Sequence, residues 1–310
     1  MKDIRELFGI EYPIVQGAMA QIAYYPLVSA VSNAGGLGII ASGGLTKEQL
    51  RTQILEVRKR TDKPFGVNLM LMEKNIDEIV DVVIEENVKV VTTGAGNPKP
   101  YVERLKSAGV KVVPVVPSLK IALKMQEIGV DAVIVEGTEA GGHVGEVTSI
   151  VLWPIVSSVL SIPVIAAGGI SDGKSLMAAF ALGAKGVQIG TAFLATEECP
   201  VSAEYKQAVI EGNELGTVVT GRKNKAPVRT IANKMTAEYL VLEERNATRD
   251  ELEHLTMGAL KKAVYEGNVE EGSVMAGQVI GRITEIKTVK ELIEGIVKEA
   301  KEVDLSSVWE

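Results

Sequence analysis

The sequence has little of what a metal centre, a disulfide framework or an aromatic stacking surface would need. Its 310 residues include 1 cysteine and 2 histidines, and only 4% of the residues are aromatic. A single cysteine excludes an internal disulfide and any multi-cysteine metal site within one chain. Cys199 precedes Pro200 and has no histidine near it in the sequence, so we predict that its thiol is unreactive. No metal site is predicted.

Long apolar runs and an excess of positive charge are also missing. No apolar run approaches the roughly 20 residues that a membrane-spanning helix needs. Residues 1–6 carry charges of both signs and lack the apolar core of a signal peptide. The formal net charge of −7 argues against a general nucleic-acid binder. We therefore expect a cytoplasmic protein that binds neither nucleic acid nor a membrane.

The first 190 or so residues alternate between strand-like and helix-like segments. Alternation of this kind implies parallel strands joined by right-handed crossovers, and eight units are the number in a TIM (β/α)8 barrel. A doubly wound open sheet is the alternative. No Gly-x-Gly-x-x-Gly motif follows the first strand, so a dinucleotide-binding Rossmann fold has little support. The predicted strands are 10–16, 37–40, 65–70, 88–93, 110–114, 132–136, 163–167 and 186–190.

The alternation stops after Thr191. A helical segment at 197–212, a Thr- and Val-rich strand candidate at 216–222 and a second helix at 251–265 surround a polar, mixed region. The pattern predicts a small, mostly helical inserted domain over 197–268, which follows strand eight. Residues 1–196 and 269–310 then form the barrel, and an amphipathic helix at 288–302 completes it.

A glycine-rich loop with one of the two histidines follows predicted strand six. Residues 134–145 read IVEGTEAGGHVG, in which Gly141 and Gly142 permit positive φ or close approach of a ligand to the backbone. Histidine can move a proton near neutral pH, and barrels carry their catalytic residues at the C-terminal ends of strands. We therefore interpret His143 as catalytic or ligand-contacting, with a structural histidine as the alternative. His254, in a predicted helix, is interpreted as a surface residue.

Two further glycine-containing turns follow predicted strands seven and eight. Gly168-Gly169 and Gly190-Thr191 occupy the usual phosphate-binding position of such barrels. Simple tight turns are the alternative. A second loop of small residues, 273–278, is predicted to add a wall to the site, unless it only links the inserted domain to the barrel.

Seven short motifs are spread along the chain: IVQGAM at 14–19, AGGLG at 34–38, KPFGVN at 63–68, TTGAGNP at 92–98, EAGGH at 139–143, AAGG at 166–169 and GSVMAGQ at 272–278. Together they resemble the FabK-type flavin-dependent enoyl-acyl-carrier-protein reductases, whose superfamily also contains the nitronate monooxygenases. The resemblance covers nearly the whole chain in the same order and is weakest around residues 200–260. Glu136 favours the reductase branch, because nitronate monooxygenases often carry Gln there.

The resemblance implies a homodimer with FMN as prosthetic group, NADH or NADPH as the source of hydride, and dependence on a monovalent cation. It also implies an acyl carrier protein, which presents the enoyl chain, as partner. In the implied reaction the flavin delivers hydride to C3 of a trans-2-enoyl thioester, and His143 supplies a proton or stabilises the thioester oxygen. The residues that would hold or surround the cofactor are Gly17, Ala18, Met19, Asn68, Glu136, Gly141, Gly142, Gly168, Gly169, Gln188, Gly190, Thr191, Ser273, Met275 and Gln278.

Two other functions stay open at this stage. In a nitronate monooxygenase with FMN, His143 would act on the acidic Cα–H of a nitro compound and O₂ would accept the electrons. A non-enzymatic flavin- or phosphate-binding module would also use the glycines, but would leave His143 without a purpose. For the acidic carrier protein, a docking patch of Arg222, Lys223, Lys225 and Arg229 is one hypothesis. An ordinary solvated loop is the other.

Overall fold

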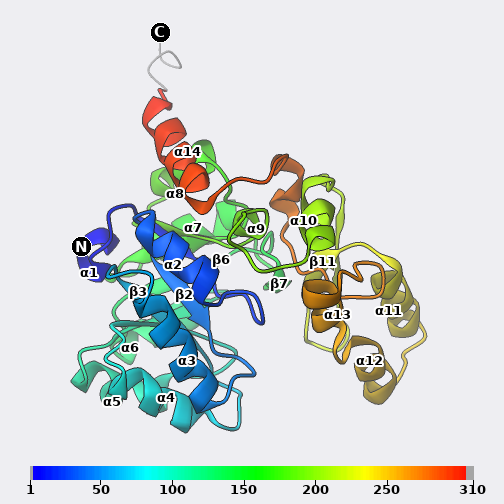
Figure 1. The fold of residues 1–310 in the computed structure, drawn as a ribbon, viewed down its shortest axis with the longest axis horizontal. Coiled ribbons are helices and arrows are strands. Elements are labelled where there is room, and N and C mark those ends of the chain that lie inside the picture. The colour runs from blue at the N-terminus through cyan, green and yellow to red at the C-terminus, as the bar shows by residue number, and fades with distance from the viewer. Residues whose placement is uncertain (1–2, 305–310) are drawn as a thin grey trace.

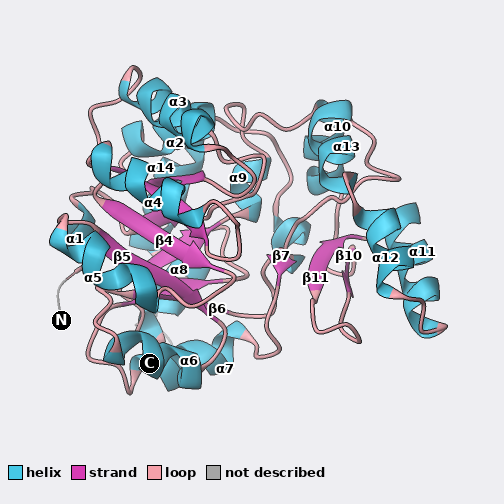
Figure 2. Ribbon diagram, turned by 90° about the horizontal axis from the view of Figure 1, so that it is seen from below, coloured by secondary structure: helices cyan, strands magenta, loops and turns pink. Residues whose placement is uncertain are grey.

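The computed structural model describes residues 3–304, and its larger part is a barrel of eight parallel strands (Figure 1, Figure 2). The strands lie in the order β1-β9-β8-β6-β5-β4-β3-β2, and an isolated parallel bridge between Val15 and Leu37 joins the two ends. This nearly closed sheet confirms the TIM barrel and excludes the open sheet. The strands are β1 (Ile14–Gln16), β2 (Gly38–Ala41), β3 (Phe65–Met70), β4 (Val90–Gly94), β5 (Lys111–Val116), β6 (Val133–Glu136), β8 (Val164–Ala167) and β9 (Gly186–Ile189).

Predicted and observed strands agree within a few residues except for the first. The predicted strand 10–16 pairs only over Ile14–Gln16. Pro13 has no N–H to donate, and the N–H groups of Glu11 and Tyr12 both donate to the carbonyl of Gly35. These two residues therefore belong to a turn against the end of the next helix instead of to the sheet.

Helices cover the outside of the barrel between successive strands (Figure 2). Thr46, Ser118, Asp172 and Thr288 accept hydrogen bonds from the first turn of the helices that follow them, which satisfies N–H groups that a helix start leaves free. The helices are α2 (Tyr25–Asn33), α3 (Lys47–Arg58), α4 (Ile76–Glu85), α5 (Lys99–Ser107), α6 (Leu119–Glu127), α7 (Ser149–Ser157), α8 (Gly173–Ala181) and the last one, α14 (Val289–Glu302).

A short helix that the sequence did not predict, α1 (Ile4–Phe8), closes one end of the barrel. Ile4 is completely buried in a core cluster with residues from inside the barrel, such as Ile134 and Ile165. Gly186, the first residue of β9, leaves room for it, since a Cβ there would lie 1.9 Å from Ile4 Cδ1. The N-terminal ends of the strands are thus filled, and the C-terminal ends are left for a site.

The segment between β9 and α14 contains a second lobe beside the barrel (Figure 1). The segment holds five α-helices, one 3-10 helix and two strands, and the polar, mixed residues 223–250 gave no sign of β11 or α11. The single helix predicted at 251–265 is two helices, because Gly258 takes φ +77° between them. The boundaries 197–268 stay a prediction. The elements are α9 (Thr191–Leu194), α10 (Ala203–Ile210), β10 (Thr217–Thr220), β11 (Val228–Ile231), α11 (Lys234–Glu244), α12 (Arg249–Thr256), α13 (Ala259–Glu266) and the 3-10 helix η1 (Gln278–Arg282).

A three-stranded antiparallel sheet joins the two lobes. Its order is β10-β11-β7, and β7 (Gly142–His143) comes from the loop that follows β6 of the barrel. The loop that carries His143 is therefore also an edge of the second lobe. Among residues 3–304, no helix has both the length and the apolarity that crossing a bilayer would demand.

Candidate active site

A cavity of about 720 Å³ opens at the C-terminal ends of the barrel strands. A volume of this size suits a cofactor or a drug-sized ligand. The predicted site residues that line it are Gly17, Ala18, Met19, Asn68, Glu136, Gly141, Gly142, His143, Gly168, Gly169, Gln188, Gly190, Thr191 and Met275. The fold thus brings together residues from five strand ends and from the loop before η1, as the barrel prediction required.

Two predicted site residues are not part of the cavity wall. Ser273 is buried, and its N–H donates to the carbonyl of Ala259 at 2.9 Å. Gln278 is exposed at the start of η1, and its N–H donates to the carbonyl of Glu139 at 3.0 Å. Both residues therefore support neighbouring loops through their backbones, and we no longer expect their side chains to contact a ligand.

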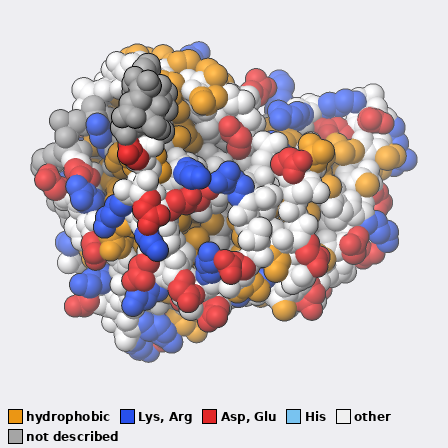
Figure 3. Space-filling view, turned by 90° about the horizontal axis from the view of Figure 1, so that it is seen from above, with side chains coloured by type: hydrophobic (Ala, Val, Ile, Leu, Met, Phe, Trp, Pro, Cys, Tyr) orange, Lys and Arg blue, Asp and Glu red, His pale blue; other side chains and the backbone are white. Residues whose placement is uncertain are grey.

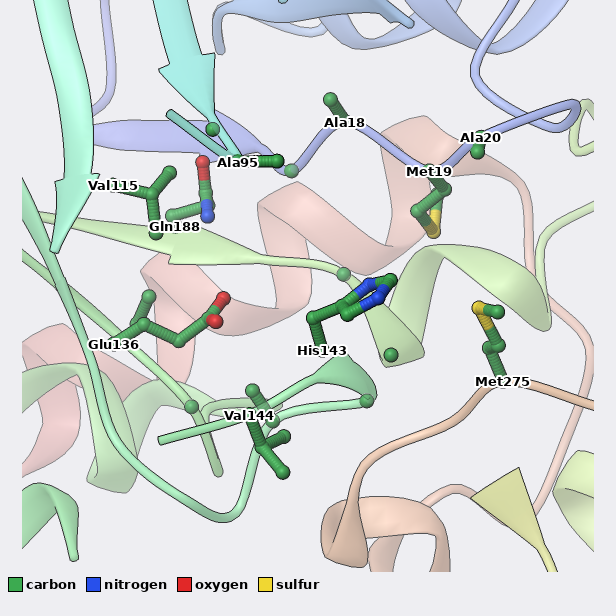
Figure 4. Close-up of a pocket in the computed structure, with 18 of the residues that line it drawn as sticks. Ala18, Met19, Ala20, Ala95, Val115, Glu136, His143, Val144, Gln188 and Met275 are labelled. Atoms are coloured by element: carbon green, nitrogen blue, oxygen red, sulfur yellow. The ribbon is translucent and has the colours of Figure 1, made fainter. Parts of the chain in front are cut away.

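His143 faces the open space of the cavity. Gly142, with φ +75°, precedes it, and β11 pairs with both residues, Arg229 opposite Gly142 and Val228 opposite His143. The imidazole is exposed to the cavity and makes no hydrogen bond within the described chain. Figure 4 shows it in the middle of the site, with Met19 and Met275 on one side and Glu136 on the other. It is therefore free to contact a bound molecule.

Ser149 joins the His143 loop to the loop that follows β8. Its N–H and its hydroxyl both lie within hydrogen-bond distance of the Glu139 carboxylate, at 3.0 Å and 2.9 Å from Oε2. The same hydroxyl lies 3.2 Å from the carbonyl of Gly168. Both loops are thus held together at one point, and Gly137 is a glycine because a Cβ there would meet the Ser149 hydroxyl at 2.0 Å.

Backbone amides face free space next to these loops. Gly168 and Gly169 both have positive φ, and the N–H groups of Gly168, Gly169 and Gly190 have no acceptor among residues 3–304. A Cβ on Gly190 would meet nothing within 4 Å. Thr191 differs, since its hydroxyl accepts a hydrogen bond from the N–H of Gly277 at 2.9 Å. Unpaired N–H groups of this kind are suited to an anion such as a phosphate.

Glu136 brings a carboxyl group to the cavity at the end of β6. No hydrogen-bond donor or cation of the described chain contacts this group. Desolvation by burial raises the pKa of Glu136 from its ordinary 4.5 to about 8, because burial disfavours the charged form. Near neutral pH the side chain is therefore mostly an uncharged acid.

This raised pKa predicts a pH dependence of stability. Between the ordinary pKa of 4.5 and the raised value of about 8, the folded state holds a proton that the unfolded state releases. Stability therefore falls as the pH rises through this window, by on the order of a few kcal/mol. We expect Glu136→Gln to lack this loss. Thermal unfolding of both proteins between pH 5 and pH 9 measures the difference, and a constant difference in Tm would contradict the raised pKa.

Comparison with known proteins identifies the family of this chain. The family model described as nitronate monooxygenase matches residues 2–81 and 72–299. The chain belongs to the nitronate monooxygenase family. It is therefore an oxidoreductase of the nitronate monooxygenase superfamily.

Individual relatives within the nitronate monooxygenase superfamily carry different names. The solved structure of FabK from Thermotoga maritima superposes on this chain with a TM-score of 0.94. The two sequences are 48% identical, and the match covers 97% of each chain. A Mycobacterium tuberculosis protein is named as the dehydrogenase of a 5-hydroxy-7a-methyl-1-oxo-octahydro-1H-indene-4-carboxyl-CoA. It is 37% identical to this chain, and the match covers 96% of this chain and 95% of the relative. A Bacillus subtilis protein named "Probable nitronate monooxygenase" is 33% identical over 96% of this chain and 99% of its own.

Some residues that line the cavity of this nitronate monooxygenase family member were not predicted from the sequence. Lys225, Ala226 and Pro227, from the turn between β10 and β11, line it, and so does Leu260 of α13. Local sequence patterns hold no signal for these contacts, because the second lobe reaches the cavity only through the tertiary fold.

The predicted docking patch needs a correction. Arg222, Lys223 and Lys225 are exposed, but Arg229 is only 6% exposed and points into the joint between the lobes. Arg229 lies on β11, where alternate residues face opposite sides, and it therefore does not belong to an exposed patch. On the face in Figure 3, basic and acidic side chains are interspersed.

Cys199 and His254 both lie outside the cavity wall. Cys199 is buried, and desolvation raises its pKa to about 12, so its thiol is unreactive near neutral pH. His254 is exposed on α12 and does not line the cavity. Within residues 3–304 no group of three or more His, Cys, Asp or Glu side chains could hold a metal ion.

Proposed function

We propose that the protein binds FMN in this cavity and reduces trans-2-enoyl thioesters carried by an acyl carrier protein, with NADH or NADPH as the source of hydride. The observation that carries the proposal is the position of His143 in the cavity of a chain that is 48% identical to FabK over 97% of both chains. The second activity of the superfamily stays as the alternative.

The residues of the cavity fit an anionic, planar cofactor. Gly168, Gly169 and Gly190 offer N–H groups that no acceptor within residues 3–304 uses, and these would hold the phosphate. The Asn68 side chain donates to the Thr92 hydroxyl at 2.9 Å, which leaves its carbonyl oxygen to accept from a ring N–H. Bound there, FMN would supply the reversible hydride chemistry that no protein side chain can provide.

His143 would then handle the charge and proton of the enoyl thioester. Negative charge develops on the thioester oxygen as C3 gains hydride, and a donor aimed at that oxygen lowers the barrier. Alternatively, the same imidazole gives a proton to C2. Glu136, being largely uncharged near neutral pH, would not oppose the negative charge that develops beside it.

A nitronate monooxygenase is the second candidate. The family model and the Bacillus subtilis relative favour it. In this reaction His143 would take a proton from the carbon that bears the nitro group, and O₂ would accept the electrons. Because both reactions need a base or acid at the same place, the site alone does not separate them, and the choice depends on which substrates react.

An anaerobic stopped-flow experiment tests the proposal. We expect the purified protein to be yellow, to bleach rapidly on mixing with NADH or NADPH, and to regain its absorbance on mixing with crotonyl thioester. The proposal fails if neither nicotinamide bleaches the protein while a nitroalkane is turned over with O₂.

The partners implied by the resemblance remain proposals too. Arg222, Lys223 and Lys225 lie on the turn beside the cavity mouth, which suits an acidic carrier protein. The homodimer and the dependence on a monovalent cation are proposed on the resemblance alone. Analytical ultracentrifugation and turnover measured in potassium, ammonium and tetramethylammonium salts would test them.

A further inference from the structure

The loop that presents His143 is closed at its base by its own backbone. The N–H of Thr138 donates to the carbonyl of Val147 at 2.9 Å, so the loop leaves and returns at one point. Farther along the loop, Gly142 and His143 pair with β11, and the N–H of Val144 donates to the carbonyl of Pro227 at 3.1 Å. The second lobe, rather than the barrel, therefore sets the backbone at His143 (Figure 2).

Arg229 contacts this loop at both places. Its backbone lies opposite Gly142 in the sheet. Its side chain crosses to the base of the loop, where Nε and Nη2 donate to the carbonyl of Thr138 at 3.2 Å and 3.1 Å. Its third hydrogen bond, from Nη1 to the Thr217 hydroxyl at 2.9 Å, ties the same group to β10. One residue thus spans the loop from base to histidine.

Burying this guanidinium needs an explanation, because it forms no ion pair within residues 3–304, and the Glu139 carboxylate acts on it only from beyond ion-pair distance. Arg229 is 6% exposed, and no carboxylate lies within ion-pair distance of it among residues 3–304. Burial lowers the pKa of Arg229, yet arginine stays charged in proteins. A buried charge without a counterion is costly for stability. The three hydrogen bonds offset that cost, and they fix the geometry of the His143 loop and of β10 rather than of the core.

We propose that Arg229 is a positioning residue that holds the His143 loop in its reactive geometry. The planar fork of arginine can give two parallel hydrogen bonds to one carbonyl while a third nitrogen contacts Thr217, which lysine cannot do. Without the fork, the loop keeps its backbone pairing at Gly142 but loses the anchor at Thr138. His143 would then lose its fixed distance to a bound substrate, and small misplacements of a reacting group reduce rates strongly.

A double-mutant cycle on enoyl turnover tests the proposal, and its choice of substrate rests on the proposed function. We expect Arg229→Met to lower kcat by about 10- to 100-fold with the flavin retained, but to lower the kcat of a His143→Ala protein by less than about threefold. A residue that acts through His143 loses its effect once His143 is gone. Equal factors in both backgrounds would show a general structural role and would overturn the proposal.

Thr217→Val is the matched control. It removes only the acceptor of the Nη1 bond, on β10, and leaves both bonds to Thr138. We expect it to keep kcat within about twofold of the original protein. If Arg229→Met does not fold, Arg229→Lys takes its place in the cycle. A loss of kcat in Thr217→Val as large as that in Arg229→Met would contradict the role of the Thr138 contact.

Hydrogen exchange gives a readout that does not depend on turnover. We expect the peptide over residues 137–145 to exchange faster in Arg229→Met than in Thr217→Val, while the strands of the barrel are unchanged. If the wild-type protein oxidises nitroalkanes instead of reducing enoyl thioesters, the proposed function fails and the same cycle is measured on that reaction. Unchanged exchange at 137–145 would overturn the positioning role whichever reaction the enzyme catalyses.

Discussion

Replacing His143 by alanine is expected to abolish most enoyl turnover while the protein keeps its flavin. A positioned acid or base contributes about 10²- to 10⁴-fold to a rate, and His143 is the only imidazole among the residues that line the cavity. Within the described part of the chain the imidazole has no hydrogen-bond partner whose loss would disturb the fold. We therefore expect an unchanged Tm, an unchanged flavin absorbance and a fall of kcat by about 10²-fold or more.

The two half-reactions locate the effect of this change. Reduction of the flavin by NADH needs no proton from His143, so its rate should stay within a few-fold of the original. Reoxidation by crotonyl thioester should become slow. His254→Ala is the matched control, since His254 is exposed on α12 and lies outside the cavity. Full enoyl turnover in His143→Ala would reject the catalytic role.

Adding a methyl group at Gly141 is expected to lower both the stability of the fold and the binding of flavin. A Cβ there would lie 2.6 Å from the carbonyl carbon of Ala276 and 2.7 Å from the nitrogen of Gly277. Both are backbone atoms, so no side-chain rotation relieves the contact. We expect Gly141→Ala to lower the free energy of unfolding by roughly 1–3 kcal/mol, with a fall in Tm of several degrees and loss of most bound flavin.

Gly190→Ala separates damage to the fold from damage to the ligand site. A Cβ at Gly190 meets nothing within 4 Å, and its φ of −116° is allowed for any residue. We therefore expect the Tm of the flavin-free protein to change by no more than a degree or two, while FMN binds more weakly. Differential scanning fluorimetry and FMN titration measure both. A Gly141→Ala protein as stable as the original would mean that the loops around Ala276 can move apart.

Most of the barrel could be predicted from the sequence because its signals are local. Thr46, Ser118 and Asp172 mark helix starts, and each does cap its helix. Apolar strands followed by polar or glycine-rich turns predict that eight strand ends meet at one face of the barrel. The family resemblance then indicated which residues at that face form the site. Fourteen of the sixteen predicted site residues do line one cavity, the exceptions being Ser273 and Gln278.

The inserted lobe was harder to predict because its structure depends on contacts distant in sequence. The two-residue strand β7 exists only through pairing of Gly142 and His143 with Arg229 and Val228. No local pattern makes two residues a strand, since such a short segment gains its hydrogen bonds wholly from a partner. For the same reason, the sequence alone placed Arg229 with the surface residues around it.

The sequence by itself determined the barrel, the position of His143 after strand six and the glycine-rich turns around the cavity. These features follow from periodicity, helix caps and backbone freedom, which a residue and its neighbours decide. Only the tertiary structure decided that Lys225 reaches the cavity mouth, that Glu136 is a desolvated acid and that Arg229 is buried beneath the histidine loop. Burial and charge depend on which distant segments pack against a residue, and the second lobe supplies those segments here.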